Sequence, residues 1–352
     1  MHRLLAIDGN SLGHRGFHSS RNDDNAGPHV VTGTVVSMIA SVWHHGPYDG
    51  VLIAFDHPVN RRKHDTPAYK AQRASSDPAI TAAIRQFRED AAAAGMYVID
   101  HPGAEADDLL AAAVDACGER AIACDVLSSD RDLIALVDDT VRLLRPAATF
   151  AQLHVEDRDA VVRRWGIQPH QYTDMAALRG DPSDGLEGAV GIGAKTAARL
   201  IRDYGSVTAL YAAINDLPPR IEASLRSARH IVERNLLLMA PIPHLEVDLD
   251  ECTYDIDRIE STFANLGERS AARRLRRAVL DPRPPQPRPP PPDDMAEDHE
   301  RDVSHKPVRE PEPGLPSAGA LAPEHDDRAN ADTDGQPASA QGQGAESQDS
   351  LF

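Results

Sequence analysis

The sequence predicts an α/β fold in which a mostly parallel β-sheet carries helices on both faces. Short apolar runs typical of buried strands alternate with segments of helical periodicity over the first 165 residues. Acidic residues directly follow several of these runs. From Pro169 onward the strand-like runs give way to helical patterns, which predicts a further, helical part of the fold.

The expected elements alternate along the chain. Strands are predicted at 4–8, 50–56, 96–100, 121–130 and 141–146, with helical patterns between them, for example at 33–45 and 105–117. Ligands of such sheets bind outside the carboxyl ends of the strands. Because acidic residues stand at several of those ends, the sequence predicts one acidic basin along a single edge of the sheet.

The acidic residues are the main candidates for chemistry. They are Asp8, Asp56, Glu105, Asp107, Asp108, Asp130, Asp132, Asp181 and Asp184. One aspartate after a strand is most often a helix cap, but the E-x-D-D and D-x-D spacings supply more carboxylates than a cap needs. Carboxylates brought together raise one another's pKa unless a cation neutralises them. Pairs of Mg²⁺ ions take oxygen ligands and can clamp a reacting phosphodiester, so the pattern predicts a metal-dependent phosphodiesterase.

A basic segment follows Asp56. Residues 61–63 are Arg-Arg-Lys, and Lys70 and Arg73 stand three positions apart, the spacing of neighbours on one helix face. By itself such a run is as often a solvated loop. Directly after an acidic candidate it predicts a clamp for phosphate.

A glycine-rich turn, Gly191-Ile192-Gly193, precedes a predicted helix that carries Lys195 and Thr196. Backbone N–H groups at a helix N-terminus bind phosphate without any base preference. A plain turn between two helices is the alternative. The aspartates upstream and the lysine just inside the helix favour capture of a DNA backbone.

Composition divides the chain near residue 281. Residues 282–352 hold 14 of the 27 prolines and, with 6 basic and 15 acidic residues, carry −9 of the net charge of −18. Such a segment buries too little apolar surface to offset its ordering entropy, and we expect it to be disordered. An acidic protein is a poor general ligand for nucleic acid, although bound metal ions would neutralise the clustered carboxylates.

Cysteine usage and hydropathy bear on location. The three cysteines have no CxxC spacing, which is typical of a reduced cytosolic protein. The sequence shows neither a secretion signal nor an apolar span of about 20 residues. We therefore expect a cytoplasmic protein without membrane association.

Several motifs occur together in the order found in one family. They are Asp8-Gly9 with 15–18, the basic segment 55–73, Glu-Ala-Asp-Asp at 105–108, Ser-Asp-Arg-Asp at 129–132, the segment 177–184, and the glycine turn within 191–197. In this combination the chain resembles the 5′-nuclease family, which includes the 5′–3′ exonuclease domain of bacterial DNA polymerase I, phage 5′ nucleases and flap endonucleases. The resemblance runs from about Leu4 to about Leu280. No polymerase sequence follows, so we expect a stand-alone nuclease.

The resemblance implies three parts. A PIN-like catalytic core would span 1–165, with a basic gateway at 59–75. A helix-three-turn-helix subdomain of the helix-hairpin-helix type, together with C-terminal core elements, would span 166–281. The Pro-rich acidic tail 282–352 would follow.

The resemblance also implies roles for individual residues. Asp8, Asp56, Glu105 and Asp107 would serve one metal ion and Asp130, Asp132 and Asp184 a second, with Asp108 and Asp181 in outer roles. Lys70 and Arg73 match the catalytic basic residues that engage the scissile phosphate. DNA contacts are implied for Arg15, Arg61, Arg62, Tyr69, Gly191, Gly193, Lys195 and Thr196. The implied cofactors are two Mg²⁺ ions, with Mn²⁺ as a substitute, and K⁺ on the carbonyls of the glycine turn.

Three positions depart from the family's usual pattern. His14 stands where relatives often have a tyrosine, Gly185 replaces a common asparagine, and Glu187 replaces a common proline. These departures bear on substrate preference and local rigidity more than on the chemistry.

The combined prediction is a monomeric, structure-specific 5′–3′ exonuclease or flap endonuclease that acts on DNA flaps or RNA–DNA primers in replication or repair. Two other classes stay open. One is a non-hydrolytic flap- or junction-binding protein, and the other is a PIN-type ribonuclease that uses the same acids on RNA.

The last five residues resemble the bacterial sliding-clamp-binding pentapeptide. Gln348, Leu351 and Phe352 are its expected anchors. A flexible tether that ends in two large apolar side chains suits a peptide that orders only on docking.

Overall fold

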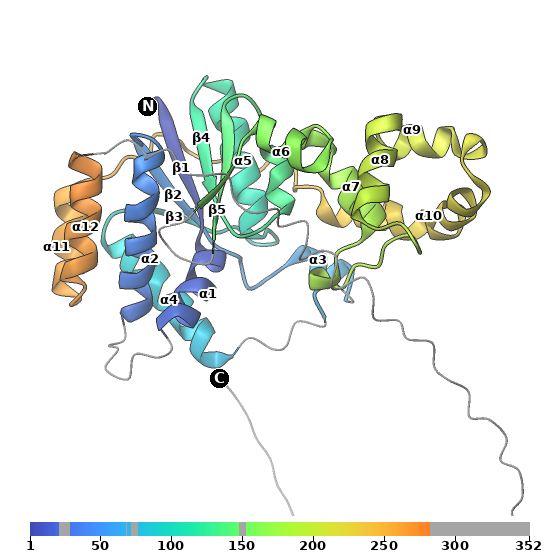
Figure 1. The fold of residues 1–352 in the computed structure, drawn as a ribbon. Coiled ribbons are helices and arrows are strands. Elements are labelled where there is room, and N and C mark those ends of the chain that lie inside the picture. The colour runs from blue at the N-terminus through green and yellow to red at the C-terminus, as the bar shows by residue number, and fades with distance from the viewer. Residues whose placement is uncertain (21–28, 68, 72–76, 148–152, 282–352) are drawn as a thin grey trace, which may run out of the picture. The chain divides into compact units, whose positions relative to one another are not determined.

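A six-stranded sheet forms the centre of the fold, in the order β3-β2-β1-β4-β5-β6 (Figure 1). The computed structural model describes residues 1–20, 29–67, 69–71, 77–147 and 153–281, which belong to one compact unit. The strands are β1 (Arg3–Asp8), β2 (Gly50–Ala54), β3 (Tyr97–Ile99), β4 (Ala123–Leu127), β5 (Val141–Pro146) and β6 (Leu153–Glu156). The first five are parallel and β6 is antiparallel to β5. This arrangement confirms the predicted mostly parallel sheet.

Alternation along β1 divides the interior into two cores. Leu4 and Ala6 face α5 (Ala106–Glu119), whereas Leu5 and Ile7 face α2 (Val30–Val42) on the other side of the sheet. The second core also receives α1 (Gly9–Ser20), α4 (Pro78–Ala93), α11 (Ile256–Asn265) and α12 (Arg269–Leu280). Successive side chains of a strand point to opposite faces, so one apolar run supports helices on both.

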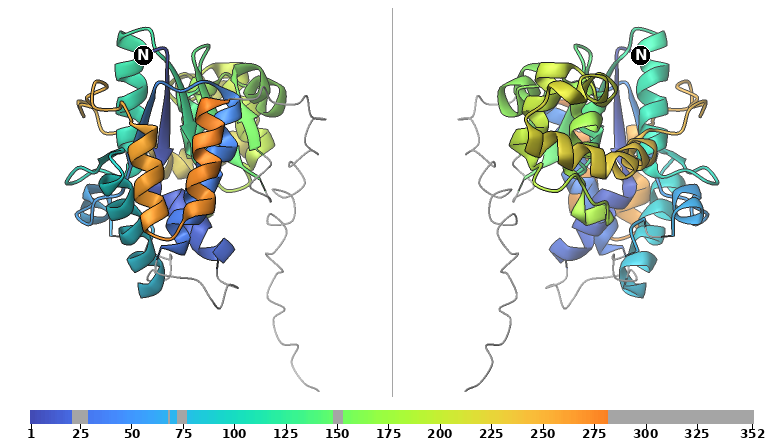
Figure 2. Two further views of the ribbon diagram at one scale, coloured as in Figure 1. Left: turned by 90° about the vertical axis from the view of Figure 1, so that its left-hand side faces the viewer. Right: turned by 90° about the vertical axis from the view of Figure 1, so that its right-hand side faces the viewer.

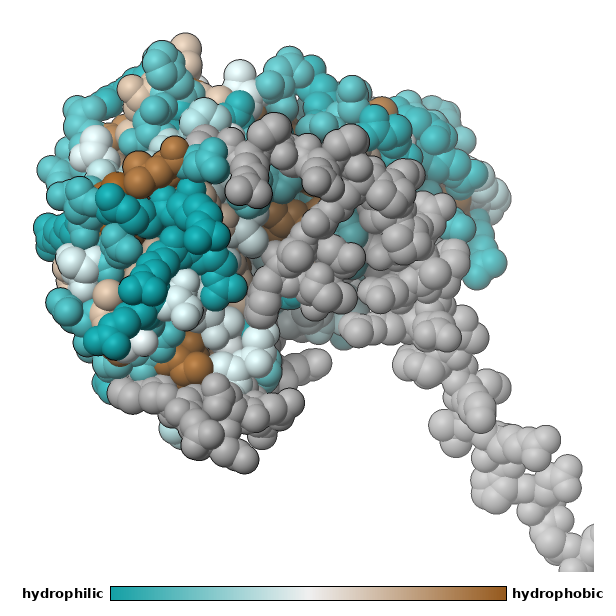
Figure 3. All heavy atoms as spheres, turned by 60° about the vertical axis from the view of Figure 1, so that its left-hand side comes forward, coloured by the Kyte–Doolittle hydropathy of each residue, from teal (hydrophilic) through white to brown (hydrophobic). Residues whose placement is uncertain are grey.

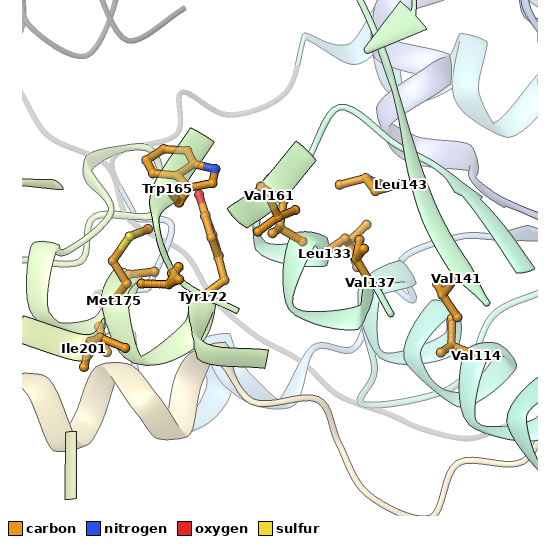
Figure 4. Packing of buried hydrophobic residues seen from close by; sticks show 14 of the residues in the cluster. Val114, Leu133, Val137, Val141, Leu143, Val161, Trp165, Tyr172, Met175 and Ile201 are labelled. Atoms are coloured by element: carbon orange, nitrogen blue, oxygen red, sulfur yellow. The ribbon is translucent and has the colours of Figure 1, made fainter. Parts of the chain in front are cut away.

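The helical part of the chain continues the first core. Its elements are α6 (Arg158–Trp165), α7 (Tyr172–Arg179), α8 (Ala194–Tyr204), α9 (Val207–Ala212) and α10 (Pro219–Met239). Trp165 packs edge-on against Tyr172, with ring centroids 5.6 Å apart, and Met175 and Ile201 lie beside them (Figure 4). Leu133 joins this group to the side chains that cover the sheet (Figure 4). A shared core therefore holds the helical part against the sheet.

The chain then returns to the sheet. Helices α11 and α12 lie together, and α12 packs along α2 (Figure 2). Phe263 and Leu275 anchor the pair, since both side chains are essentially buried. The return places α11 and α12 on the side of the sheet away from α8, α9 and α10 (Figure 1).

The predicted elements match the observed ones with some differences. The run predicted as a strand at 121–130 is a strand only to Leu127, and a loop follows. The sequence pattern misses β6, because it is short and contains the polar His154 and Glu156. The helix predicted at 33–45 begins at Val30 and ends in a 3-10 turn, and the basic segment contains a short helix, α3 (Arg61–Asp65).

Some predictions lie outside the described residues. These concern Arg73, the tail 282–352, and the clamp-binding residues Gln348, Leu351 and Phe352. Within the described ranges, no helix combines the length and the hydrophobicity that crossing a membrane requires.

Candidate active site

The carboxyl ends of β1, β2 and β4 meet at one edge of the sheet. Their registers align there, because Asp8 pairs with Ala54. A cleft of about 1090 Å³ opens at this edge. Its acidic lining residues are Asp8, Asp56, Asp107, Asp130 and Asp181, and the glycine turn Gly191–Gly193 lines it as well. The structure thus brings these acids and the glycine turn into one cleft.

A smaller pocket of about 50 Å³ shares Asp107 with the cleft. The remaining predicted acids line this second pocket: Glu105, Asp108, Asp132 and Asp184. All nine predicted acidic residues therefore lie around two neighbouring pockets at one edge of the sheet.

Asp8 ends β1 and accepts two hydrogen bonds. Its Oδ1 accepts the N–H of Ser11 at 2.8 Å, and its Oδ2 accepts the hydroxyl of Ser128 at 2.7 Å. Burial, together with the charges of Asp56 and Asp130, nevertheless raises the pKa of Asp8 to about 7. The charged form of Asp8 is therefore unfavourable unless a cation lies close to it.

Asp56 and Asp107 bring β2 and α5 to the same site. Asp56 Oδ1 accepts the N–H of Ala106, the first residue of α5, at 2.8 Å, and its Oδ2 accepts the amide of Asn10 at 3.2 Å. Asp107 has no hydrogen-bond donor in the part of the chain that the structure describes. Burial and then the charge of Asp130 raise the pKa of Asp107 well above its usual value.

The loop after β4 presents Asp130 and Asp132. Asp130 Oδ1 accepts the N–H of Asp132 at 2.9 Å, so the D-x-D spacing forms a tight turn. Burial, followed by the charge of Asp130, raises the pKa of Asp132 to about 8. Asp107 lines both pockets, so it has the negative charge of Asp130 in one and that of Asp132 in the other.

Lys70 places a positive charge among these acids. Its Nζ lies 2.8 Å from Oε1 of Glu105 and 3.9 Å from Oδ2 of Asp184. The backbone N–H of Lys70 also donates a hydrogen bond to the backbone carbonyl of Asp184, at 2.9 Å. Burial alone would lower the pKa of Lys70, but the charges of Glu105 and Asp184 raise it above its usual value. Its φ of 54° is in the left-handed region, a strained conformation that other contacts must hold and that clusters at functional sites.

Arg62 lies within the acidic cluster. Its guanidinium contacts both carboxylate oxygens of Asp108 at 2.6 and 2.7 Å and reaches Glu105 at 3.3 Å. It also donates to the carbonyls of Leu238 and Ala240, at 2.8 Å each. Arg62 thereby ties α3, α5 and the end of α10 together. Because its side chain is only 10% exposed, little of it is accessible for the predicted DNA contact.

Tyr69 is similarly internal. Its side chain is buried, and its hydroxyl donates to Glu105 at 3.1 Å and lies 3.3 Å from Asp184. This geometry orients two carboxylates, and the predicted DNA contact of Tyr69 finds no support in it. The sequence shows only that a tyrosine precedes Lys70, so packing was needed to reveal the role.

Arg61 and Arg15 differ in exposure. Arg61 is 72% exposed and pairs with Asp65 on the same short helix, which leaves its guanidinium at the surface. Arg15 is partly buried and donates to the carbonyl of Ala147. Neither residue lines the cleft.

The glycine turn leads into α8. Gly191 has a φ of 75°, a conformation that side chains disfavour, and Gly193 is the residue before the helix. In the described part of the chain no side chain caps α8, so its first N–H groups are available to solvent or an anion. Lys195 is exposed in the first turn, and Thr196 beside it is half-buried.

Two arginines that the sequence pattern does not single out also line the cleft. Arg131 stands between Asp130 and Asp132, and Arg179 ends α7 just before Asp181. A cation inside an acidic motif is the signal that could have found them. Both add positive charge, as Lys70 does, to a wall that carries five acidic residues.

Gly188 allows two backbone segments to touch beside the cleft. A Cβ at this position would lie 2.0 Å from the carbonyl oxygen of Arg179. We expect Gly188→Ala to lower the free energy of unfolding by about 3 kcal/mol, because the backbone has to move. Gly118→Ala in α5 is the control, since open space surrounds that Cβ and alanine favours the helix. Chemical denaturation compares the two variants, and equal stabilities would contradict the close backbone packing.

The acids of the cleft do not form a ready coordination sphere. Among the residues that the structure describes, no three Asp, Glu, His or Cys side chains lie together as ligands for one ion. Like charges repel, and Asp8 and Asp56 accept hydrogen bonds from the protein instead. The donor set still fits a hard divalent cation. It consists of carboxylate oxygens, and burial and mutual repulsion raise the pKa of three of them.

Two family models match the chain one after the other. Residues 3–166 match the N-terminal resolvase-like domain of 5′–3′ exonucleases, and residues 167–260 match their C-terminal SAM fold. The boundary between the two matches falls directly after α6.

Relatives with this region include two bacterial polymerases. The DNA polymerase I of Mycobacterium bovis is 34% identical over 285 residues, which is 77% of this chain and 31% of that protein. The thermostable DNA polymerase I of Thermus thermophilus is 32% identical over 256 residues, or 70% of this chain and 30% of that protein. The chain therefore spans about a third of the length of these relatives.

Solved structures share the fold. The T5 D15 protein co-crystallised with metal ions has a TM-score of 0.57 at 22% identity and covers 79% of this chain and 98% of its own. The catalytic core of Rad2 in complex with DNA substrate has a TM-score of 0.51 at 14% identity, and the match covers 80% of this chain and 92% of the Rad2 chain. Human GEN1 in complex with Holliday junction DNA has a TM-score of 0.54 at 13% identity, and the match covers 79% of this chain and 72% of GEN1. Since the family models span both the sheet and the helical part that form the cleft, the chain belongs to the 5′–3′ exonuclease family.

Proposed function

We propose that this protein hydrolyses phosphodiester bonds of DNA near 5′ ends and flaps, using two divalent metal ions. The observation that carries the proposal is the cleft at the carboxyl edge of the sheet, which brings five acidic residues together with the glycine turn. Acids of this kind suit metal-assisted phosphoryl chemistry, and an uncapped helix start suits a phosphate backbone. One cleft would therefore bind and cut the same strand.

The acids divide between two ions. Asp8, Asp56, Glu105 and Asp107 would hold one, and Asp130, Asp132 and Asp184 the other, with Asp108 and Asp181 supporting them. Bound Mg²⁺, or Mn²⁺ in its place, would supply an activated water and stabilise the leaving oxygen. Asp107, which lines both pockets, is the residue best placed to serve both ions.

Basic groups would position the substrate. Lys70 sits on the wall of the cleft with its ammonium held by Glu105, so its charge is fixed where a reacting phosphate would lie. Arg131 and Arg179 extend this positive charge along the same cleft. The N–H groups at the start of α8, with Lys195, would hold the duplex backbone away from the reacting bond, with K⁺ on the carbonyls of the turn.

Lys70→Ala and Lys195→Ala should give different defects. Lys70 would bind the phosphate most strongly in the transition state, so its loss should lower the single-turnover rate more than it weakens substrate affinity. Lys195 would contact backbone phosphate, so its loss should weaken duplex binding and reduce the salt slope by about 1. Single-turnover cleavage and binding titrations in EDTA separate the two effects. If both variants lose affinity and keep the wild-type rate, the role of Lys70 is wrong.

The substrate class is tested by comparing a labelled DNA flap with a single-stranded RNA in Mg²⁺. The proposal predicts rapid cleavage of the flap near its junction and little cleavage of the RNA. Preferential cleavage of the RNA would favour the ribonuclease alternative. Tight flap binding without cleavage would favour a junction-binding protein.

The finer expectations about partners rest on the sequence. A sliding clamp bound through Gln348, Leu351 and Phe352, a monomeric state and a cytoplasmic location stay predictions. Deleting the last five residues should abolish any clamp binding and leave flap cleavage without a clamp unchanged.

A further inference from the structure

Helix α12 has an unusual charge distribution. Its sequence, RSAARRLRRAVL, contains five arginines and no acidic residue. Ala271, Ala272, Leu275 and Ala278 are buried against the rest of the protein. Four arginines point away from that core and are exposed: Arg269, Arg273, Arg274 and Arg277. We call these four the arginine face.

The arginine face is unpaired. None of the four guanidinium groups has a hydrogen-bond or ion-pair partner within the ranges that the structure describes. By contrast, the fifth arginine, Arg276, pairs with Asp257 and Glu260 of α11. Some exposed arginines elsewhere do have acidic partners, for example Arg85, Arg120, Arg158 and Arg226, whereas Arg163, Arg199 and Arg220 are scattered along the chain. In a protein with a net charge of −18, this concentration of unpaired cations indicates an anionic ligand.

The spacing of the arginines suits an extended anion. Arg269, Arg273 and Arg277 recur every four residues, so they form a row of roughly 12 Å at 1.5 Å per residue. Arginine also binds phosphate oxygens in a bidentate manner. The side of the protein that carries α11 and α12 presents a largely hydrophilic surface (Figure 3).

The arginine face begins near the catalytic edge of the sheet. Glu268, just before α12, packs against Gly33 in the first turn of α2. Helix α2 packs on α1, whose residues Ser11 and His14 line the cleft. The glycine turn before α8 lies on the other side of the sheet from α12 (Figure 1). The glycine turn and the arginine face therefore lie on opposite sides of the cleft.

We infer that the arginine face binds the phosphate backbone of a second duplex arm of the substrate, the arm not held by the glycine turn. This inference rests on the proposed function and extends it. A nuclease with one duplex-binding surface would recognise a simple 5′ end, whereas two surfaces on opposite sides of the cleft would recognise a junction. The arginine face therefore contributes specificity for flaps that have duplex DNA on both sides.

The acidic tail is the competing ligand for this surface. Residues 293–302 contain six acidic residues and begin 13 positions after Leu280, the last residue of α12. DNA is favoured because the arginine face starts at the edge of the sheet where the cleft lies. The row also matches an anion of regular charge, since duplex DNA presents about one negative charge per 1.7 Å of its axis.

The test removes the arginine face in the full-length protein. The variant carries Arg269→Gln, Arg273→Gln, Arg274→Gln and Arg277→Gln. The matched control carries Arg85→Gln, Arg120→Gln, Arg158→Gln and Arg226→Gln, which changes the net charge equally at scattered, ion-paired sites. Binding is measured in EDTA over a salt series. The ligands are a flap with two long duplex arms and two versions that each have one arm shortened.

We expect the arginine-face variant to bind the two-armed flap at least about 10-fold more weakly than the control, with a salt slope smaller by about 3 to 4. Shortening one particular arm should lower the affinity of the wild type and of the control for the flap. It should cause no further loss of affinity in the arginine-face variant. Equal affinities of variant and control for all three ligands would overturn the inference. It would also fall if a peptide of residues 293–302 bound the protein lacking residues 282–352 but not its arginine-face variant, while the variant and the control bound DNA alike, because the tail would then be the ligand.

Cleavage in Mg²⁺ keeps this test separate from that of the proposed function. A wild type that binds the second arm through α12 but cuts no flap would sustain the inference and sink the proposed nuclease activity. If instead the wild type cuts flaps, and the arginine-face variant cuts and binds them like the control, the nuclease activity is supported and the inference about α12 is wrong.

Discussion

Asp107→Ala and Asp130→Ala are each expected to lower flap cleavage by at least about 10³-fold while leaving flap binding in EDTA close to that of the wild type. Each change deletes a carboxylate that would help to hold the metal ions, and with it the stabilisation of charge that develops on the reacting phosphate. Binding should persist, because the glycine turn lies on a different part of the cleft wall and Lys195 stands in the helix that follows it.

Asp115→Ala is the matched control for Asp107→Ala. Asp115 lies in the same helix, α5, but is exposed and outside both pockets. The Asp115→Ala variant should cleave the flap at the wild-type rate. Near wild-type turnover by Asp107→Ala or Asp130→Ala at saturating Mg²⁺ would refute the assignment of these acids to metal binding.

Arg62→Ala is expected to cause the largest loss of stability of any single charged residue discussed above, about 3–5 kcal/mol. Its guanidinium is nearly buried and joins Asp108, Glu105 and two carbonyls near the end of α10. Removing it leaves the buried carboxylate of Asp108 without its main partner, which costs more than the lost attraction itself. Denaturant unfolding measures the change.

Arg61→Ala provides the comparison, since the two arginines are adjacent in sequence but differ in burial. Arg61 is 72% exposed and pairs with Asp65 within one short helix, so its loss should leave stability near that of the wild type. If both variants unfolded at the same denaturant concentration, Arg62 would not hold α3, α5 and α10 together as the contacts indicate.

The sheet and the acidic edge could be predicted because their signals are local. β1, β2 and β4 are apolar runs followed within a few residues by Asp8, Asp56 and Asp130. Parallel strands bring their carboxyl ends together, so the pattern places these acids at one edge without knowledge of the packing. Strand β6 escaped prediction because half of its four residues are polar and its pairing with β5 is decided by tertiary structure.

The contacts of the basic segment could not be predicted from its sequence. Arg62 donates to the carbonyl of Leu238, 176 residues away, and Tyr69 reaches Asp184, 115 residues away. A run of basic residues looks alike whether it faces solvent or acids, and only packing distinguishes Arg61 from Arg62. The same holds for α12, where packing against α2 decides which arginines are exposed.

The proposed nuclease activity depends on divalent metal ions acting in the acidic cleft. The most direct measurement is single-turnover cleavage of a 5′-flap DNA over a range of Mg²⁺ concentrations. With two ions required, the rate should rise with about the square of the Mg²⁺ concentration well below saturation, and EDTA should abolish cleavage. A flap-cleavage rate that does not change with Mg²⁺ and survives EDTA, or no cleavage at any Mg²⁺ or Mn²⁺ concentration, would contradict the account.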